Sequence, residues 1–500
     1  MTALERAIRQ PAPVRGFGAR SPLDGLERRS LGFSDVFAQS VAAVAPTAAA
    51  TTVVLLVAGL SPTAALTSLL VAGAVSVLVA QTVGQFARRF ASAGALYTYV
   101  ARGLGTGAGL ATGVAAVIGY AAIAMFALLG GASYLVLLLG PIVPPGPLGI
   151  AAVLLGEALV LGVVLVRGIR LSSRIALIVE LLSVALIVAL LTALLVRIGP
   201  VDPAALLPAG SDSPLTIAAG ALIALTAFVG FESAATLGVE ARTPLRTVPR
   251  AMAGTVVVAT GLYALAAATQ VAGFHALGAD LAASASPVNE LADAYGLGPW
   301  ALLADLGIAA SFLACAIGSM TALTRVLFTM GREGVLPRAT GRAHRRHGTP
   351  VVAVGLTLPV VVGAPLALVA GGVGLRDAMH LTVVIGGFGY IASYVLVCAA
   401  APVFLRRIGE LTARAALTAI ACALALASAA IAFAVVDVSS GSPAVWVAAV
   451  LAVAASVAVI WRIRRAPVGP LGTYDVPTAS AVLGGVAREG TPADGRNGDG

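Results

Sequence analysis

The chain has 500 residues, of which 59% are hydrophobic and only 11% are charged. Soluble domains usually carry about 25% charged residues, so this composition excludes a soluble protein of this length. The net charge is +9 and every basic residue is Arg, but the arginines are spread between apolar segments and form no single patch, which argues against a nucleic-acid-binding protein.

Twelve apolar segments follow one another along the chain, each close to the ~20 residues that cross a bilayer. Two polar stretches, 1–30 and 466–500, flank them, and their composition predicts disordered tails. The sequence therefore predicts an all-α integral membrane protein with about 12 transmembrane helices. The predicted spans lie near residues 34–59, 63–86, 105–131, 147–167, 172–196, 214–238, 248–273, 299–330, 350–370, 377–404, 412–435 and 443–463.

The arginines predict the orientation of these spans. If the N-terminus is cytoplasmic, almost all arginines fall on the cytoplasmic side, and Arg197 and Arg376 are the exceptions. The outer loops carry acidic residues such as Asp280 and Asp437 instead. Because an excess of Arg marks cytoplasmic loops, we expect a multi-pass protein of the cell (plasma) membrane with both termini in the cytoplasm.

The first span contains an apparent interruption at Ala45-Pro46-Thr47-Ala48. Proline lacks the N–H that an interior helix position donates, and its ring clashes with the preceding turn. A simple kink, which is common in membrane helices, is the alternative to a true break.

The sixth span contains a second interruption, at Phe228-Val229-Gly230-Phe231-Glu232. Glycine weakens a helix by roughly 1 kcal/mol relative to Ala. A membrane-embedded glutamate normally faces the protein interior or a water-filled cavity. A polar connector, 240–250, follows before the next apolar run. We therefore expect a broken helix, and secondary transporters bind substrate at such breaks.

Two halves follow from this arrangement. Helices one to five, within residues 31–198, and helices six to ten, within 199–408, have opposite orientation, as an inverted repeat requires. The first helix of each half carries the interruption. The last two helices, within 409–465, lie outside the repeat.

Three separated motifs carry a resemblance to a known family. They are GFE at 230–232 with its Pro- and Arg-containing connector, RRFASAGALY at 88–97, and GREGVLP at 331–337 with a following Thr-Pro. In this order they resemble the amino acid–polyamine–organocation (APC) transporters over roughly residues 30–465. The chain departs from the family pattern with Ala91 for Pro, Ala95 for Gly, and Pro46 with flanking alanines for a Gly-x-Gly break. The resemblance implies a LeuT-type 5+5 inverted repeat plus two extra helices.

The breaks offer backbone groups to a zwitterion. We expect the N–H groups of Thr47, Ala48 and Ala49 to meet a substrate carboxylate, because a helix N-terminus attracts anions. Carbonyls near Val44, Phe228 and Gly230 would meet the ammonium group. The resemblance implies that Phe231 covers the substrate as a gate, unless it is a packed core residue. The predicted substrate-binding set is Val44, Ala45, Pro46, Thr47, Ala48, Ala49, Tyr120, Phe228, Gly230, Phe231 and Glu232.

Membrane-embedded acids are the candidates for coupling. Glu232 follows the break and either steadies it by hydrogen bonds, which we favour, or contacts substrate. Glu180 in the fifth span is the candidate proton or cation site, because the resemblance implies a place beside helices one and eight; a structural hydrogen bond between helices is its alternative. Glu157 and Asp305 are weaker candidates, and Asp305 is expected to face an outer vestibule.

The sequence predicts a secondary active transporter of amino acids or related amines, driven by protons or by exchange. The alternatives are sodium coupling or another organic solute on the same fold, and, from a different class, a channel or a membrane enzyme. We find no nucleophile, base or metal constellation, so we expect no enzyme activity, no cofactor, no metal site and no nucleic-acid partner. The three cysteines are expected to be packing residues.

Overall fold

The computed structural model describes residues 23, 25–61, 63–140, 142–144, 146–201, 206–208, 213–284, 286–344, 346–465 and 471–475, without the side chains of 169–173. Within these residues the regular structure is helical, and a single backbone bridge joins Leu31 to Ala241. The prediction of an all-α protein is confirmed.

Twelve helical spans long and apolar enough to cross a membrane lie in the described part of the chain, which confirms the predicted number. Two short helices, α5 (Leu96–Leu104) and α11 (Pro287–Ala294), were not predicted. The spans are α2 (Phe33–Val44) with α3 (Pro46–Leu60), α4 (Ala65–Ala87), α6 (Thr106–Leu138), α7 (Pro147–Arg167), α8 (Ile169–Ile198), α9 (Pro214–Thr226) with the 3-10 helix η2 (Phe231–Leu237), α10 (Pro244–Leu277), α12 (Gly298–Arg332), α13 (Val351–Ala370), α14 (Leu375–Arg407), α15 (Ala413–Ser439) and α16 (Ala444–Arg465).

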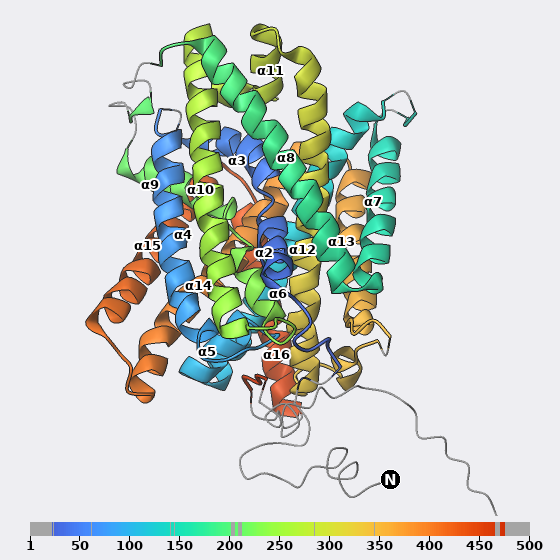
Figure 1. The fold of residues 1–500 in the computed structure, drawn as a ribbon, viewed down its shortest axis with the longest axis vertical. Helices are drawn as coiled ribbons and strands as arrows, with labels where there is room; N and C mark the ends of the chain where they lie inside the picture. Colours follow the sequence, from blue (N-terminus) through green and yellow to red (C-terminus); the bar gives the residue numbers. More distant parts are fainter. Residues whose placement is uncertain are drawn as a thin grey trace, which may run out of the picture.

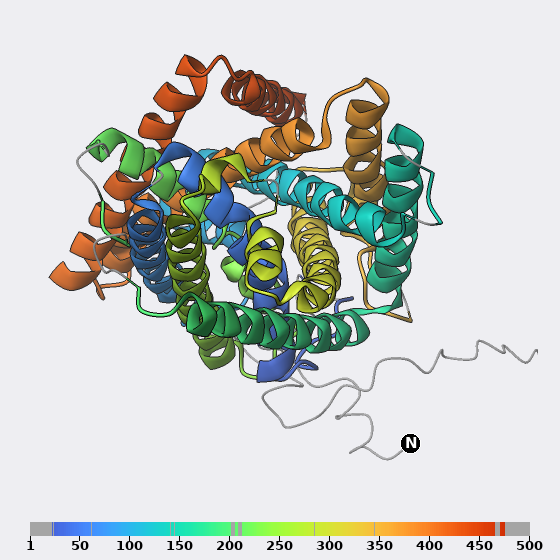
Figure 2. The ribbon, with the colours of Figure 1, turned by 90° about the horizontal axis from the view of Figure 1, so that it is seen from above.

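The interrupted spans lie inside the bundle. The first span is the most buried of the described spans, and α16 is the least buried. Figure 1 shows the course of both spans. Seen from above, α15 and α16 lie at the periphery, and α8 runs along the opposite side of the bundle (Figure 2). A site at the breaks is therefore screened from lipid by the surrounding helices.

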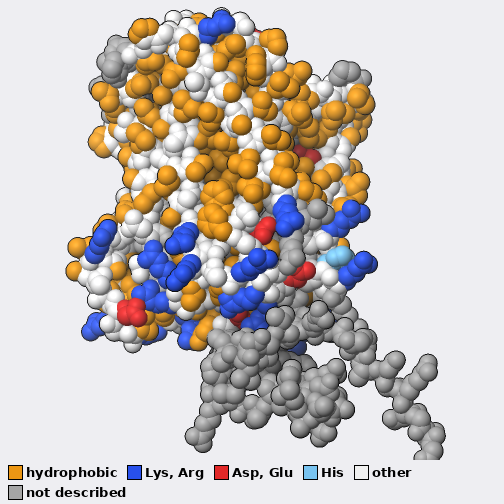
Figure 3. Space-filling model, in the orientation of Figure 1, with side chains coloured by type: hydrophobic (Ala, Val, Ile, Leu, Met, Phe, Trp, Pro, Cys, Tyr) orange, Lys and Arg blue, Asp and Glu red, His pale blue; other side chains and the backbone are white. Residues whose placement is uncertain are grey.

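Charge separates along the long axis of the molecule. Arginine side chains gather at one end, and hydrophobic side chains cover most of the visible surface beyond it (Figure 3). We call this end, which holds α5 and the loop that follows α12, the arginine-rich end, and the other end the outer end. An apolar belt above a basic end is the pattern that a multi-pass membrane protein shows.

The first span is interrupted at Ala45, whose φ and ψ of 48° and 62° lie in the left-handed region. That conformation costs roughly 1–2 kcal/mol in a residue with a side chain. Pro46 accounts for the loss of the right-handed conformation here, because a residue before proline is disfavoured in the right-handed helix. Proline is also well suited to the first helical position, so α3 begins at Pro46. The break is thus a single residue, narrower than the predicted 45–48.

The sixth span is interrupted by a turn over residues 227–230, after which η2 continues as a 3-10 helix. Gly230 has a φ of 109°, which glycine adopts without steric cost. A Cβ at this position would lie 2.6 Å from the carbonyl oxygen of Ala43, in the first span. Glycine therefore allows both the turn and the close approach of the two interrupted spans.

Parts of both tails pack on the arginine-rich end, so the prediction of disordered tails does not hold for residues 25–30 and 471–475. Asp475 accepts hydrogen bonds from Arg28 at 2.6 Å and Arg29 at 3.0 Å. The Thr473 N–H donates to Glu333, which also accepts from the hydroxyl of Tyr97. Burial raises the pKa of Glu333, although these two donors oppose the shift. The remaining predicted tail residues, 1–22, 24, 466–470 and 476–500, lie outside the described part.

Candidate functional site

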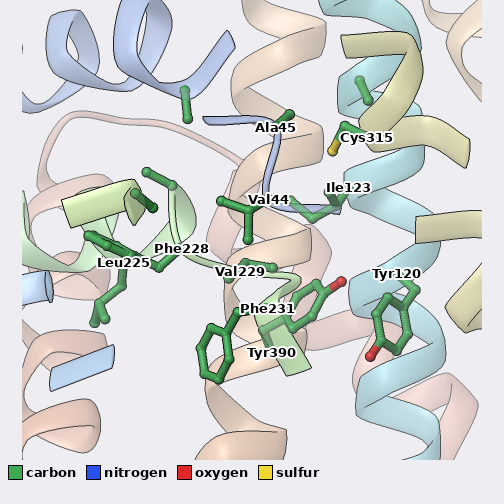
Figure 4. Packing of buried hydrophobic residues seen from close by; sticks show 14 of the residues in the cluster. Val44, Ala45, Tyr120, Ile123, Leu225, Phe228, Val229, Phe231, Cys315 and Tyr390 are labelled. Carbon is green, nitrogen blue, oxygen red and sulfur yellow. The ribbon is translucent and has the colours of Figure 1, made fainter. Parts of the chain in front are cut away.

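The two breaks face each other near the middle of the bundle (Figure 4). Gly230 touches the backbone of Ala43, and the Ser40 hydroxyl donates to the Phe231 carbonyl at 2.7 Å. The Gln39 side-chain amide donates to the Gly318 carbonyl of α12 at 2.8 Å. The two interrupted spans are thus bonded to each other, and the first span is also bonded to the eighth span.

A small cavity of about 20 Å³ lies between the breaks. It has room for about one water molecule, so the site is closed in this conformation. No charged side chain is among its lining residues. The lining consists of Ala43, Val44, Ala45, Ala48, Ala49, Val53, Ile123, Phe126, Thr226, Ala227, Val229, Phe312, Cys315 and Val383.

A larger cavity of about 540 Å³ lies toward the outer end, between α3, α6, α11 and α14. Its wall includes Thr51, Leu55 and Tyr134, together with Arg376 and His380. A ligand the size of an amino acid fits in this volume. We call it the outer vestibule.

Two phenylalanine rings separate the outer vestibule from the small cavity. Phe126 of α6 lines both spaces, and its ring centroid lies 5.7 Å from that of Phe312 in an edge-to-face arrangement. Tyr134 lines the vestibule and lies 6.2 Å from Phe312, between ring centroids. Movement of these rings would join the two spaces.

The arginine-rich end is closed by buried polar contacts. Arg325 of α12 donates two hydrogen bonds to Glu240, at 2.8 and 3.0 Å, and both side chains are almost fully buried. The Tyr97 hydroxyl bonds to Glu333 beside this pair, with the tail segments packed outside it. The conformation thus has a vestibule at one end, a closed cavity between the breaks, and buried polar contacts at the arginine-rich end.

Glu180 of α8 lies at the first break and is fully buried. Its Oε1 accepts the Thr47 N–H at 3.2 Å and the Ser311 hydroxyl at 2.9 Å. Its Oε2 has no hydrogen-bond partner among the described residues. A carboxylate at the start of α3 is favoured by the helix dipole. Glu180 therefore joins three spans and retains a free oxygen for a proton or a cation.

The backbone N–H groups predicted to bind a substrate carboxylate already have hydrogen-bond acceptors in this conformation. The Thr47 N–H bonds to Glu180, and the Ala48 N–H bonds to the Ser311 hydroxyl at 3.3 Å. The Ala49 N–H is bonded within the helix, to the Ala45 carbonyl at 3.0 Å. A substrate carboxylate would have to displace Glu180 or Ser311 to reach these groups. Their role as ligands stays a prediction.

Glu232 steadies the second break. Its Oε2 accepts the Gly230 N–H at 3.1 Å and the Tyr394 hydroxyl, and its Oε1 accepts the Tyr120 hydroxyl at 2.8 Å. It is fully buried, and each oxygen has a partner. This geometry supports the structural role over direct contact with substrate. Tyr120, predicted as a substrate-binding residue, points to Glu232 and does not line the small cavity.

Phe231 also differs from its expected position. It is fully buried, packs on Tyr394 with 5.8 Å between ring centroids, and does not line the small cavity. Phe126 and Phe312 stand between site and vestibule instead, and the sequence reasoning did not select them. Both lie in long apolar helices with weak periodicity, so no local signal identified the side that faces the break.

The other candidates occupy structural positions. Asp305 accepts two hydrogen bonds from Asn289, at 3.0 and 2.9 Å, and ties α11 to α12 without lining the outer vestibule. Glu157 is buried against Gly131, and neither carboxyl oxygen has a hydrogen-bond partner in the described residues. The three cysteines are buried and unpaired, and no group of three metal-ligating side chains occurs in the described part of the chain.

Comparison with known proteins agrees with this architecture. Residues 35–466 match the family of amino acid permeases. The chain belongs to the amino acid permease family. The APC resemblance drawn from the three motifs is thereby confirmed, and the family is one of membrane transporters, which points away from an enzyme.

Curated relatives of this permease-family chain are transporters. It is 32% identical over 225 residues to an uncharacterized transporter of Mycobacterium bovis, covering 44% of this chain and 48% of the relative. It is 28% identical over 222 residues to the branched-chain amino acid permease BcaP of Lactococcus lactis, covering 42% and 46%. The chain spans about half the length of the curated relatives it matches.

A solved structure supports the fold assignment of this family member. A manganese transporter of Eremococcus coleocola matches with a TM-score of 0.53 over 87% of this chain and 93% of that chain, at 15% identity. At that identity the likeness concerns the fold alone. The predicted LeuT-type fold class is confirmed.

Proposed function

We propose that this protein is a secondary active transporter that carries neutral amino acids with aliphatic side chains across the plasma membrane by alternating access. The observation that carries the proposal is the contact between the two interrupted spans, with an occluded cavity beneath an outer vestibule. Discontinuous helices at mid-depth supply free backbone groups to a small zwitterion without requiring a charged side chain. Membership of the amino acid permease family supports the substrate class.

The chemistry of the cavity supports an apolar substrate side chain. Its lining consists mainly of aliphatic and aromatic residues and includes no acid or base. A cationic side chain or a polyamine would therefore lose hydration without gaining an ion pair. The relatives named as branched-chain amino acid permeases, from Lactococcus lactis and Bacillus subtilis, support the same class.

Glu180 is the proposed coupling site, and the proton is the proposed coupling ion. Its free Oε2 takes a proton where the site is desolvated, and protonation removes the negative charge at the start of α3. Sodium is the second candidate, because the Glu180 carboxylate, the Ser311 hydroxyl and carbonyls at the end of α2 are oxygen ligands at a helix break.

The arginine-rich end is proposed to face the cytoplasm, with both termini on that side. The bias of arginines to one end supports this orientation (Figure 3). The outer vestibule then opens to the external medium, and the buried Arg325–Glu240 pair closes the cytoplasmic end.

Uptake into proteoliposomes tests the proposal. Leucine, isoleucine and valine should accumulate against a concentration gradient when the lumen is alkaline, and a protonophore should abolish accumulation. Arginine, glutamate and putrescine should neither accumulate nor compete. Accumulation that follows a sodium gradient and ignores the protonophore would select sodium. Flux that never exceeds equilibration would indicate a channel and contradict active transport.

A further inference from the structure

A third cavity, distinct from the transport site, opens at the arginine-rich end. It has a volume of about 410 Å³ and lies between the end of α4, the end of α14 and the start of α15. These three helices contact one another, and they lie together at the lower left of Figure 1. The polar side chains of its wall are Gln81, Thr82, Gln85, Arg88, Thr412, Arg414 and Thr418.

The charge of this cavity is positive and uncompensated. Arg88 and Arg414 are exposed, and neither side chain has a hydrogen-bond or ion-pair partner within the described residues. The nearby Glu410 is bound by Arg89 instead. Two arginines that line one cavity repel each other, and an anion bound by both would remove that repulsion.

The start of α15 adds donors to the same cavity. Thr412 caps the helix by accepting the Ala415 N–H at 3.2 Å, and its carbonyl accepts the Ala416 N–H at 3.0 Å. The N–H groups of Ala413 and Arg414 remain without a bond among the described residues. A helix start with free N–H groups favours an anion, whereas Arg414 in that first turn is unfavourable unless an anion is bound.

The surroundings of the cavity select the type of anion. Beside it, α15 and its preceding loop expose Leu411, Leu417, Ile420 and Leu424, and α15 lies at the periphery of the bundle (Figure 2). Exposed apolar side chains next to a basic cavity at the membrane surface fit acyl chains next to a phosphate. A soluble phosphate compound would gain nothing from these leucines.

We propose that this cavity binds the phosphodiester headgroup of an anionic phospholipid. Arg88 and Arg414 pair with the phosphate oxygens, the start of α15 donates backbone hydrogen bonds, and the glutamines and threonines hold the polar end of the headgroup. The acyl chains lie along the exposed face of α15. The cavity includes none of the residues of the transport site, so this binding is independent of the proposed function.

Native mass spectrometry on the delipidated full-length protein tests the proposal. Dioleoyl phosphatidylglycerol should bind at least tenfold more tightly than dioleoyl phosphatidylcholine, which has the same acyl chains without net charge. The double variant Arg88→Gln/Arg414→Gln should lose at least tenfold of the phosphatidylglycerol affinity. The control Arg406→Gln/Arg464→Gln removes the same charge from the same end outside the cavity, and it should stay within twofold of wild type.

Equal binding of the two lipids, or equal affinity of the cavity and control variants, would overturn the proposal. Inorganic phosphate serves as the soluble arm. If millimolar phosphate displaces the lipid and stabilises the protein as strongly as the lipid does, the ligand is a soluble phosphate and the lipid assignment fails. On the wild-type protein, a photo-activatable phosphatidylglycerol should label residues 81–88 and 412–418, and labelling confined to other helices would also overturn it.

Discussion

Replacement of Glu180 by Gln separates its proposed role in proton coupling from its structural role as a hydrogen-bond link between helices. The Gln side chain keeps an Oε1 that accepts the Thr47 N–H and the Ser311 hydroxyl, so the link between α8, α12 and the start of α3 survives. The variant lacks Oε2, which is the atom proposed to take the proton. A neutral side chain also loses the favourable interaction of a charge with the α3 dipole, which is worth about 0.3–1 kcal/mol. The variant should therefore fold and bind substrate.

The size of the expected effect follows from the driving force. A gradient of one pH unit stores about 1.36 kcal/mol per proton, so one proton per substrate sustains about tenfold accumulation. Glu180→Gln should accumulate substrate to a ratio near one. Exchange of internal for external leucine moves no net proton, and it should fall by less than about threefold. The variant thus loses the coupling of transport to the proton gradient and retains substrate binding.

The assay compares two measurements on the same proteoliposomes: uptake driven by an imposed pH gradient, and leucine exchange without one. Glu157→Gln is the matched control, because Glu157 is also a buried membrane carboxylate but lies away from the first break, beside Gly131. This control should retain gradient-driven uptake. Gradient-driven accumulation by Glu180→Gln, or an equal loss of accumulation and exchange, would refute Glu180 as the coupling site.

Three further predictions concern the breaks, the rings and the closed end. Gly230→Leu should abolish substrate binding in a thermal-shift assay while membrane yield stays normal, because its side chain would meet the Ala43 carbonyl; Gly261→Ala, in open space on α10, should bind normally. Phe312→Leu should enlarge the cavity and improve phenylalanine binding about tenfold relative to leucine, and an unchanged ratio would remove Phe312 from the selectivity wall. Glu240→Gln should cost about 3–5 kcal/mol in the free energy of unfolding by leaving Arg325 buried and unpaired, and a loss below about 1 kcal/mol would contradict its burial.

The two breaks show what can be predicted from local sequence. Pro46 and Gly230 act through their own backbone preferences, so both interruptions were predictable within a few residues. The length of the first break was not predictable, because Thr47 and Ala48 return to the helix. Their N–H groups bond to Glu180 and Ser311, which come from distant spans. The partners of a helix start depend on neighbouring helices.

The residues that line the small cavity, in contrast, could not be predicted from local sequence. Phe126 and Phe312 sit in long spans that are apolar on almost every side, so hydropathy carries no information on which residue faces inward. The expected gate at Phe231 was placed by resemblance, and Tyr120 was included in the predicted substrate-binding set, but both side chains pack around Tyr394 and Glu232 instead. Only the rotation of each helix in the bundle decides these contacts.

The sequence by itself determined the number of spans, the charge asymmetry and the two interruptions, because hydrophobic length, arginine position and the backbone limits of proline and glycine are local properties. The tertiary structure decided the partners: Glu180 against the start of α3, Arg325 against Glu240, and the tail segment around Asp475 on the arginine-rich end. It also decided the apolar cavity that argues for an aliphatic substrate. Helix packing brings together residues that lie far apart in the sequence, 85 positions for Arg325 and Glu240 and 133 for Glu180 and Thr47, and in a membrane almost any apolar side chain can face either lipid or protein.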